Sequence, residues 1–327
     1  MKMVRFLGIG KESTYRTAVS ASEYINIISE SIAPDWDRVK LEEAGYRFAR
    51  DKIPGGFKVT GDISLYVDAQ SITKFLEGLL GSVSTSNDGE ITAYKHTFTP
   101  ANSLPSYTLE IFPESPSDYS RQISGVGILS MRLEAEAGSP LTATIGILGA
   151  KEELISPSST TPSFANISPL PFNNSSVEIE DSAVATVEAF RLDISNSIPD
   201  DAFVLNNMFL PALRLEGGEI TGEMDIAFTS WDYYRLFYGS STATEPSETP
   251  STVKIEFIAT GGSTGSGTAG YENYKLAITL PKCRLDTSNA NFDRRSRIIQ
   301  RLGFEALHDS SSGYAIQVEV VNTKSAP

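Results

Sequence analysis

The sequence predicts a mainly β fold of the α+β class, with two tandem β-sandwich domains that each carry one short flanking helix. Three observations lead to this prediction. Apolar and polar residues alternate along much of the chain, only one segment has a clear helical periodicity, and the stretch containing that segment recurs once further on. Alternation indicates half-buried antiparallel strands, and a recurring stretch indicates a duplicated unit.

Alternation is clearest in residues 62–67, where Ile63, Leu65 and Val67 fall on one face of an extended chain. Polar residues occupy the positions between them, as in a strand with one buried and one solvated face. The same pattern recurs in four further segments, at residues 131–136, 253–257, 276–280 and 316–320. We therefore expect strands at all five places.

A helix is expected at residues 69–80. Its apolar residues follow the spacing of one helical face, namely Ile72, Phe75, Leu76, Leu79 and Leu80. Asp68 stands where an N-cap belongs, and Gly81 stands where a C-cap glycine belongs. The single apolar face predicts a helix that covers a sheet.

The internal repeat pairs residues 60–78 with residues 221–239, without a gap. Both stretches begin with Thr-Gly and an acidic residue, and they share their strand and helix apolar positions. Asp68 coincides with Thr229 as the expected cap. A second match pairs residues 29–32 with 195–198. The repeat predicts a first domain at 1–154, a Ser-, Pro- and Asn-rich linker at 155–176, and a second domain at 177–327.

Such units have open sheet edges, which proteins either cover or pair. A chain with two units can pair its edges with neighbouring copies and close a ring. The sequence thus favours a self-assembling structural subunit over an enzyme.

Composition excludes several function classes. The 327 residues are 40% hydrophobic and 21% charged with a net charge of −14, so the chain should fold but lacks the basic surface that grips nucleic acid. No apolar run is long enough to predict a transmembrane helix, and the N-terminus lacks the pattern of a secretory signal. Cys283 is the single cysteine and is expected to be a small buried apolar residue.

No catalytic, metal or cofactor site is predicted. The Gly/Ser-rich residues 261–270 match both a nucleophile elbow and a dinucleotide fingerprint, but a strand pattern follows where both motifs need a helix. His96 and His308 lack the spacing of metal ligands. We interpret residues 240–252 and 260–270 as mobile surface loops.

Four arginines form the basic cluster of the chain. Either they contact phosphate, or they pair with acidic residues within or between subunits. The second interpretation is favoured because the protein is acidic and no aromatic residues are interleaved. The four are Arg294, Arg295, Arg297 and Arg301.

The chain resembles the tail tube proteins of long-tailed viruses, in the branch with a duplicated tube domain. The features that carry the resemblance are the opening Gly8-x-Gly10-x-Glu12-x-x-Tyr15-x-Thr17, the Ser-x-Ser-Ile strand end, and the Thr-Gly strand followed by a short helix. The resemblance implies trimeric, pseudo-hexameric rings that stack into a tube in the virion tail, assembled in the host cytoplasm. DNA would cross this tube without specific binding. The tape measure, terminator and baseplate proteins would be partners, with no cofactor, membrane or catalytic residue.

The resemblance also implies that two long excursions, residues 33–58 and 199–219, touch the neighbouring ring. The candidate ring-stacking residues are Trp36, Glu42, Glu43, Tyr46, Arg47, Arg50, Asp51, Phe203, Met208 and Phe209. On the matched strands the polar positions would line the lumen, where acidic groups repel phosphate and let DNA pass. The candidate lumen-facing residues are Asp62, Ser64, Glu223 and Asp225.

Two alternatives stay open at the level of sequence. The chain could be another tail ring component, such as a baseplate hub or terminator, which would form single rings. It could also be a monomeric β-barrel that binds a ligand in an apolar pocket.

Overall fold

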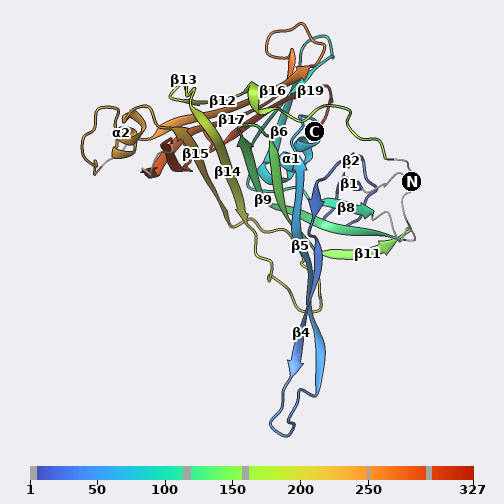
Figure 1. Cartoon of the computed structure of the whole chain (residues 1–327). Coiled ribbons are helices and arrows are strands. Elements are labelled where there is room, and N and C mark those ends of the chain that lie inside the picture. The colour runs from blue at the N-terminus through green and yellow to red at the C-terminus, as the bar shows by residue number, and fades with distance from the viewer. Residues whose placement is uncertain (1–5, 113–118, 157–161, 249–250, 292–296) are drawn as a thin grey trace.

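The structure is a computed structural model that describes residues 6–112, 119–156, 162–248, 251–291 and 297–327. These residues form nineteen strands linked in antiparallel ladders and two short α-helices, which confirms the prediction of a mainly β protein (Figure 1).

The strands of the N-terminal half are β1 (Phe6–Lys11), β2 (Glu23–Ile25), β3 (Ser29–Glu30), β4 (Ala33–Leu41), β5 (Asp51–Tyr66), β6 (Gly81–Asn87), β7 (Tyr94–Pro100), β8 (Tyr107–Phe112), β9 (Ser120–Glu136), β10 (Thr142–Gly149) and β11 (Lys151–Ile155). Those of the C-terminal half are β12 (Ser175–Ile179), β13 (Ser182–Ala183), β14 (Val187–Ser197), β15 (Gly217–Ala227), β16 (Val253–Ser263), β17 (Asn273–Ala290), β18 (Ile299–Ala306) and β19 (Gln317–Asn322). The helices are α1 (Ile72–Leu80) and α2 (Asp232–Tyr238), and a short 3-10 turn occupies Phe172–Asn174.

Eight strands lie side by side in what we call the central sheet. Their order is β3–β5–β10–β9–β14–β15–β18–β17. Four strands come from each half of the chain, and the two groups meet where β9 pairs with β14. The central sheet therefore crosses from one half of the sequence to the other without interruption.

The remaining strands, apart from β4, form outer layers over one face of the central sheet. The long strands β9 and β17 take part in both layers, because their N-terminal parts pair with β8 and β11 or with β16 and β19. The buried core lies between the layers. Phe190 of β14 stacks on Phe257 of β16 with ring centroids 4.9 Å apart, which joins the layers in the C-terminal half. Burial of such rings supplies much of the stability.

The two groups of four strands share irregularities as well as order. A β-bulge occurs in the β9–β10 ladder beside Gly146, and another in the β17–β18 ladder between Leu285 and Thr287. The β8–β9 ladder shifts between Tyr107 and Leu109, and the β16–β17 ladder shifts between Val253 and Ile255. Bulges are specific features of a fold, so their recurrence at matching places is more informative than shared strands alone.

Helix α1 confirms the expected helix, with a difference at its start. Gly81 adopts the left-handed conformation of a C-cap, and all but one of the residues of α1 are buried. Asp68 is not the N-cap, because its carboxylate accepts hydrogen bonds from the backbone of Gln70 and Ser71 in a turn that precedes the helix. In the repeat, α2 begins after Trp231 rather than after Thr229.

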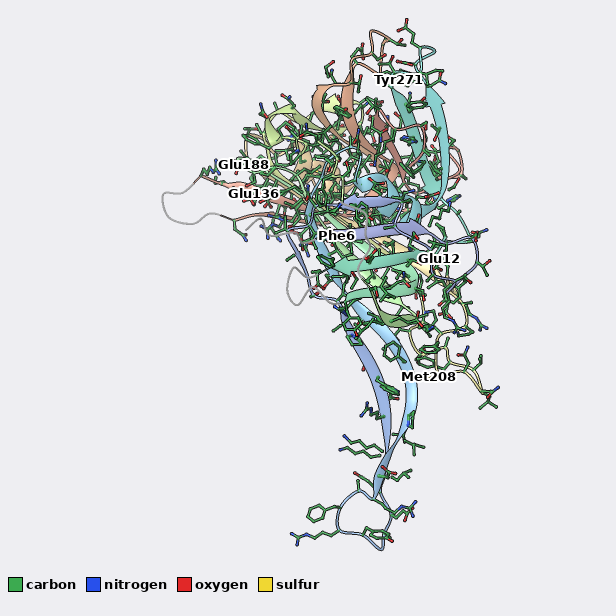
Figure 2. The ribbon with its side chains drawn as sticks, turned by 90° about the vertical axis from the view of Figure 1, so that its right-hand side faces the viewer. Phe6, Glu12, Glu136, Glu188, Met208 and Tyr271 are labelled. Carbon is green, nitrogen blue, oxygen red and sulfur yellow. The ribbon has the colours of Figure 1, made fainter. Side chains whose placement is uncertain are left out.

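The expected linker and the loop after β16 both contact the body of the fold within the described residues. Leu170 is fully buried and exchanges backbone hydrogen bonds with Val67 and Leu141. The loop after β16 reaches the β6–β7 hairpin, where Tyr271 bonds to Ser86 and stacks under Lys95. Residues 260–263 of the expected loop 260–270 belong to β16, so the loop begins only after Ser263, and the end of the molecule that carries Tyr271 lies away from β4 (Figure 2).

Candidate assembly site

The four candidate lumen residues lie on one face of the central sheet. On β5, Ile63 and Leu65 point into the core, so Asp62 and Ser64 point to the opposite, polar face. On β15, Met224 is buried and Glu223 is exposed on that same polar face. The register of the ladders thus brings both halves of the repeat onto one continuous surface.

Asp225 shares this face but is only 8% exposed. Two guanidinium nitrogens of Arg301 on β18 donate hydrogen bonds to its carboxylate at 2.7 and 3.3 Å. Arg191 of β14 donates a third hydrogen bond at 3.1 Å. Burial alone would raise the pKa of Asp225, but the hydrogen bonds from Arg301 and Arg191 outweigh burial and hold the pKa below its ordinary value. Asp225 therefore joins three strands rather than presenting free charge.

We expect Asp225→Asn to lower the free energy of unfolding by about 1–3 kcal/mol at neutral pH, because two arginines lose a charged acceptor. A depressed folded-state pKa stabilises the protein above the unfolded pKa, and the benefit is lost as pH falls through the folded value. The difference between the two proteins in chemical denaturation should therefore shrink below about pH 4. A difference that stays constant down to pH 2 would contradict this role.

Other charged residues share the polar face but were not among the candidates. Arg132 and Glu134 of β9 lie beside Asp193 of β14, and Arg132 contacts both acids at 3.0 and 3.8 Å. The sequence indicates the positions of Arg132 and Glu134, because these two residues alternate with the buried Met131 and Leu133. The pairing of β9 with β14 could not be read from the internal repeat, because it joins the two halves of the chain.

The basic cluster is split by the structure. Arg301 pairs with Asp225, and Arg297 donates to Glu188 at 2.6 Å, so both make ion pairs within the chain. Contacts of these arginines with another subunit stay a prediction. Arg294 and Arg295 lie outside the described residues.

The first excursion is a hairpin that we call the arm, residues 33–57 of β4 and β5, which extends well away from the body (Figures 1 and 2). Its outer part carries apolar side chains in solvent: Phe48 is 76% exposed and Tyr46 is 58% exposed. Charged candidates surround them, and Arg50 pairs with Glu43 at 3.1 Å. Glu42, Arg47 and Asp51 are also exposed here. Exposed aromatic residues on a projecting hairpin are typical of a contact surface.

The second excursion projects less far than the arm (Figure 2). It is an irregular segment that runs along the base of the arm, where the backbone of Met208 accepts a 2.8 Å bond from Phe57 (Figure 2). Phe209 packs edge-on against Phe57, and Phe203 covers Gly56 so closely that a Cβ there would lie 2.3 Å from the ring. Trp36 also packs edge-on against Phe57, with ring centroids 6.2 Å apart. These aromatic residues fix the direction of the arm.

The N-terminal motif is a structural element. Glu12 is buried and accepts hydrogen bonds from Ser106, Thr108 and two backbone amides. Gly8 and Gly10 of β1 leave no room for a side chain, since a Cβ would lie 2.7 Å from Ala21 or 2.6 Å from the carbonyl oxygen of Ser20. The motif thus holds β1 and the following loop against the outer layer.

Two edges of the central sheet lack a partner strand in the part of the chain that the structure describes. β3 and the first half of β4 pair with β5 alone. Residues 284–290 of β17 pair with β18 alone, whereas the matching part of β9 pairs with both β10 and β14. Unpaired strand edges are ready-made sites for adding another strand.

We find no candidate metal-binding or nucleophilic site among the described residues. They contain no cluster of metal-ligating side chains, and no helix among them is long and apolar enough to span a membrane. Cys283 is fully buried, which confirms its interpretation, and burial raises the pKa of its thiol to about 12. His96 is buried and bonds to Thr85 and Asn322. Residues 261–265 run from β16 into a turn without a following helix.

Open sheet edges, an exposed polar face and a projecting arm define a structural subunit built for association. A family model described as phage tail tube protein matches residues 4–306. The chain therefore belongs to the phage tail tube protein family, and it is a non-enzymatic structural component of the virion tail. A search of curated proteins found no match.

Proposed function

We propose that the chain is the major tail tube subunit, and that three copies form a pseudo-hexameric ring which stacks into a tube around a DNA-conducting lumen. The observation that carries this proposal is the composition of the central sheet. It contains two sets of four strands in the same order with matching bulges, and the sets are joined through β9 and β14. We infer that the sets are tandem copies of one tube domain, divided near residues 155–176.

The two unpaired edges of the central sheet can pair between neighbouring subunits and so close the sheets into a barrel. The β9–β14 joint inside the chain has no counterpart at the end of β17 among the described residues. Each subunit therefore carries one half of a second such joint on β17 and the complementary half on β3 and β4. Three subunits with two copies each would form six joints, three within chains and three between them. A closed barrel removes every edge, which an isolated subunit cannot do.

The helices support the same arrangement. α1 is almost entirely buried, whereas no residue of α2 is buried and Trp231 beside it is 51% exposed. α1 packs against β6, β7 and β9, and β7 in turn pairs with β19 of the second half. A neighbouring subunit can cover α2 in the way that this chain covers α1.

Stacking and conduction rest on the arm and the polar face. The arm would reach the next ring, and the polar face with Asp62, Ser64, Glu223 and Asp225 would line the lumen. Further partners are the tape measure, the terminator and the baseplate, which meet the tube along its lumen or at its ends, with genomic DNA passing unbound.

We expect the purified protein to form filaments whose rings contain three chains. Native mass spectrometry of ring species and negative-stain microscopy of filaments test this together. Single rings that never stack would favour a terminator or baseplate role, and a stable monomer at high concentration would contradict ring formation.

A further inference from the structure

The unpaired edge of the central sheet on β3 and β4 is closed by side chains. The backbone N–H of Ile32 donates to the carboxylate of Glu30 at 2.8 Å, and the carbonyl oxygen of Ile32 accepts from Arg121 at 3.0 Å. Two residues on, Pro34 has no N–H to offer. Both backbone groups of Ile32 thus point outward and are occupied without a partner strand, which is how proteins protect a sheet edge.

The residue that matches Ile32 in the other half is Leu192. Ile63 of β5 corresponds to Met224 of β15 in the internal repeat, and these pair with Glu30 and Phe190 respectively. Two residues further along each strand stand Ile32 and Leu192. In the joint within the chain, Leu192 pairs with Leu133 of β9.

The residue that matches Leu133 in the other half is Ala290. The bulge after Gly146 sets Ser130 opposite that glycine, and the matching bulge sets Thr287 opposite Gly303. Counting three residues on from Ser130 and from Thr287 gives Leu133 and Ala290. The edge of β17 that would meet a neighbour therefore includes Ala290.

We propose that Ile32 of one subunit pairs with Ala290 of the next subunit, and that Glu30 and Arg121 occupy the backbone of Ile32 until this exchange takes place. The inference rests on the proposed ring and specifies its joint. The same register sets Ala33 opposite Asn289 on the polar face. We call Glu30 and Arg121 the edge caps. Because the edge caps compete with an incoming strand for the backbone of Ile32, they slow the pairing of a free subunit with incorrect strand edges.

A disulfide tests the register. Ala33 and Asn289 are both exposed, and opposed residues of a non-hydrogen-bonded antiparallel pair have Cα atoms about 4.5 Å apart, which suits a disulfide. The double variant Ala33→Cys/Asn289→Cys should yield bands of two and three linked chains on non-reducing gels after assembly. Ala33→Cys/Thr287→Cys is the matched control, because it requires a slip of two residues.

The outcomes separate the inference from the proposed function. Rings that form without cross-links in the first variant, or with cross-links in the control instead, would overturn the register while leaving the tube intact. Absence of rings in the unmodified protein would overturn the proposed function itself. Linked products larger than three chains would contradict a three-subunit ring.

Removal of the Glu30 carboxylate tests whether it must leave the N–H of Ile32 before the neighbouring strand can pair there. Glu30→Ala should shorten the half-time of ring formation about 2- to 10-fold, because the N–H of Ile32 is no longer occupied. Glu30→Gln removes the same charge but keeps an acceptor, so it should have a smaller effect. Light scattering during assembly gives both rates. Equal acceleration by the two variants would assign the effect to charge, and no acceleration by Glu30→Ala would overturn the cap.

Discussion

Replacing Phe48 at the end of the arm with serine is expected to leave rings intact and to prevent their stacking. Phe48 is 76% exposed in the subunit, so the folded chain loses almost no packing. If each arm buries this ring against the neighbour, the loss is about 2 kcal/mol for each contact. Three arms act together, so ring–ring association should weaken by about 6 kcal/mol, a factor of about 10⁴. Sedimentation of rings and tubes measures this directly.

The control for this variant is Ile91→Ser. Ile91 is 68% exposed but lies on the turn between β6 and β7, away from the arm. It should leave stacking unchanged. Normal tubes from Phe48→Ser, or equal loss of stacking from both variants, would show that the arm does not mediate ring contacts.

Reversal of charge on the polar face is expected to slow DNA release. The double variant Asp62→Lys/Glu223→Lys changes each subunit by four charges and a three-subunit ring by twelve. A basic wall would gain affinity for phosphate through counterion release. Release from virions carrying this tube should slow by more than about tenfold at low salt and should recover as salt rises. Asp225 is kept unchanged, because lysine beside Arg191 and Arg301 would disrupt the sheet itself.

A matched variant carries the same charge change elsewhere. Glu90 and Glu245 are exposed and lie outside the central sheet. Glu90→Lys/Glu245→Lys should leave the release rate unchanged. Unchanged release with Asp62→Lys/Glu223→Lys, in virions with normal tails, would remove these residues from the lumen.

Much of the fold could be predicted from local patterns, because alternation reports which face of a strand is buried. Residues 62–66 and 276–280 lie in strands as expected, although β5 ends one residue before Val67, and the buried stripe of α1 fits its helical spacing. The repeat also found the polar positions of β5 and β15, which lie on one face. These features depend on neighbours in sequence or on a repeated strand.

Features that depend on distant partners could not be predicted. The arm has solvent on both faces, so residues 33–41 have no alternation, and the sequence predicts only a long excursion here rather than a strand. Strand register also corrects the match between residues 29–32 and 195–198. Ser31 and Arg191 pair with Asp62 and Glu223, so their matching positions lie six residues earlier in β14 than the sequence suggested.

An electron-microscopic reconstruction of the assembled tube tests the central claim most directly. The account predicts three chains in each ring and a closed barrel of 24 strands, three copies of the central sheet, with β17 of each chain joined to β3 and β4 of the next. Six chains in a ring, or a barrel whose β17 and β3 edges remain apart, would contradict it.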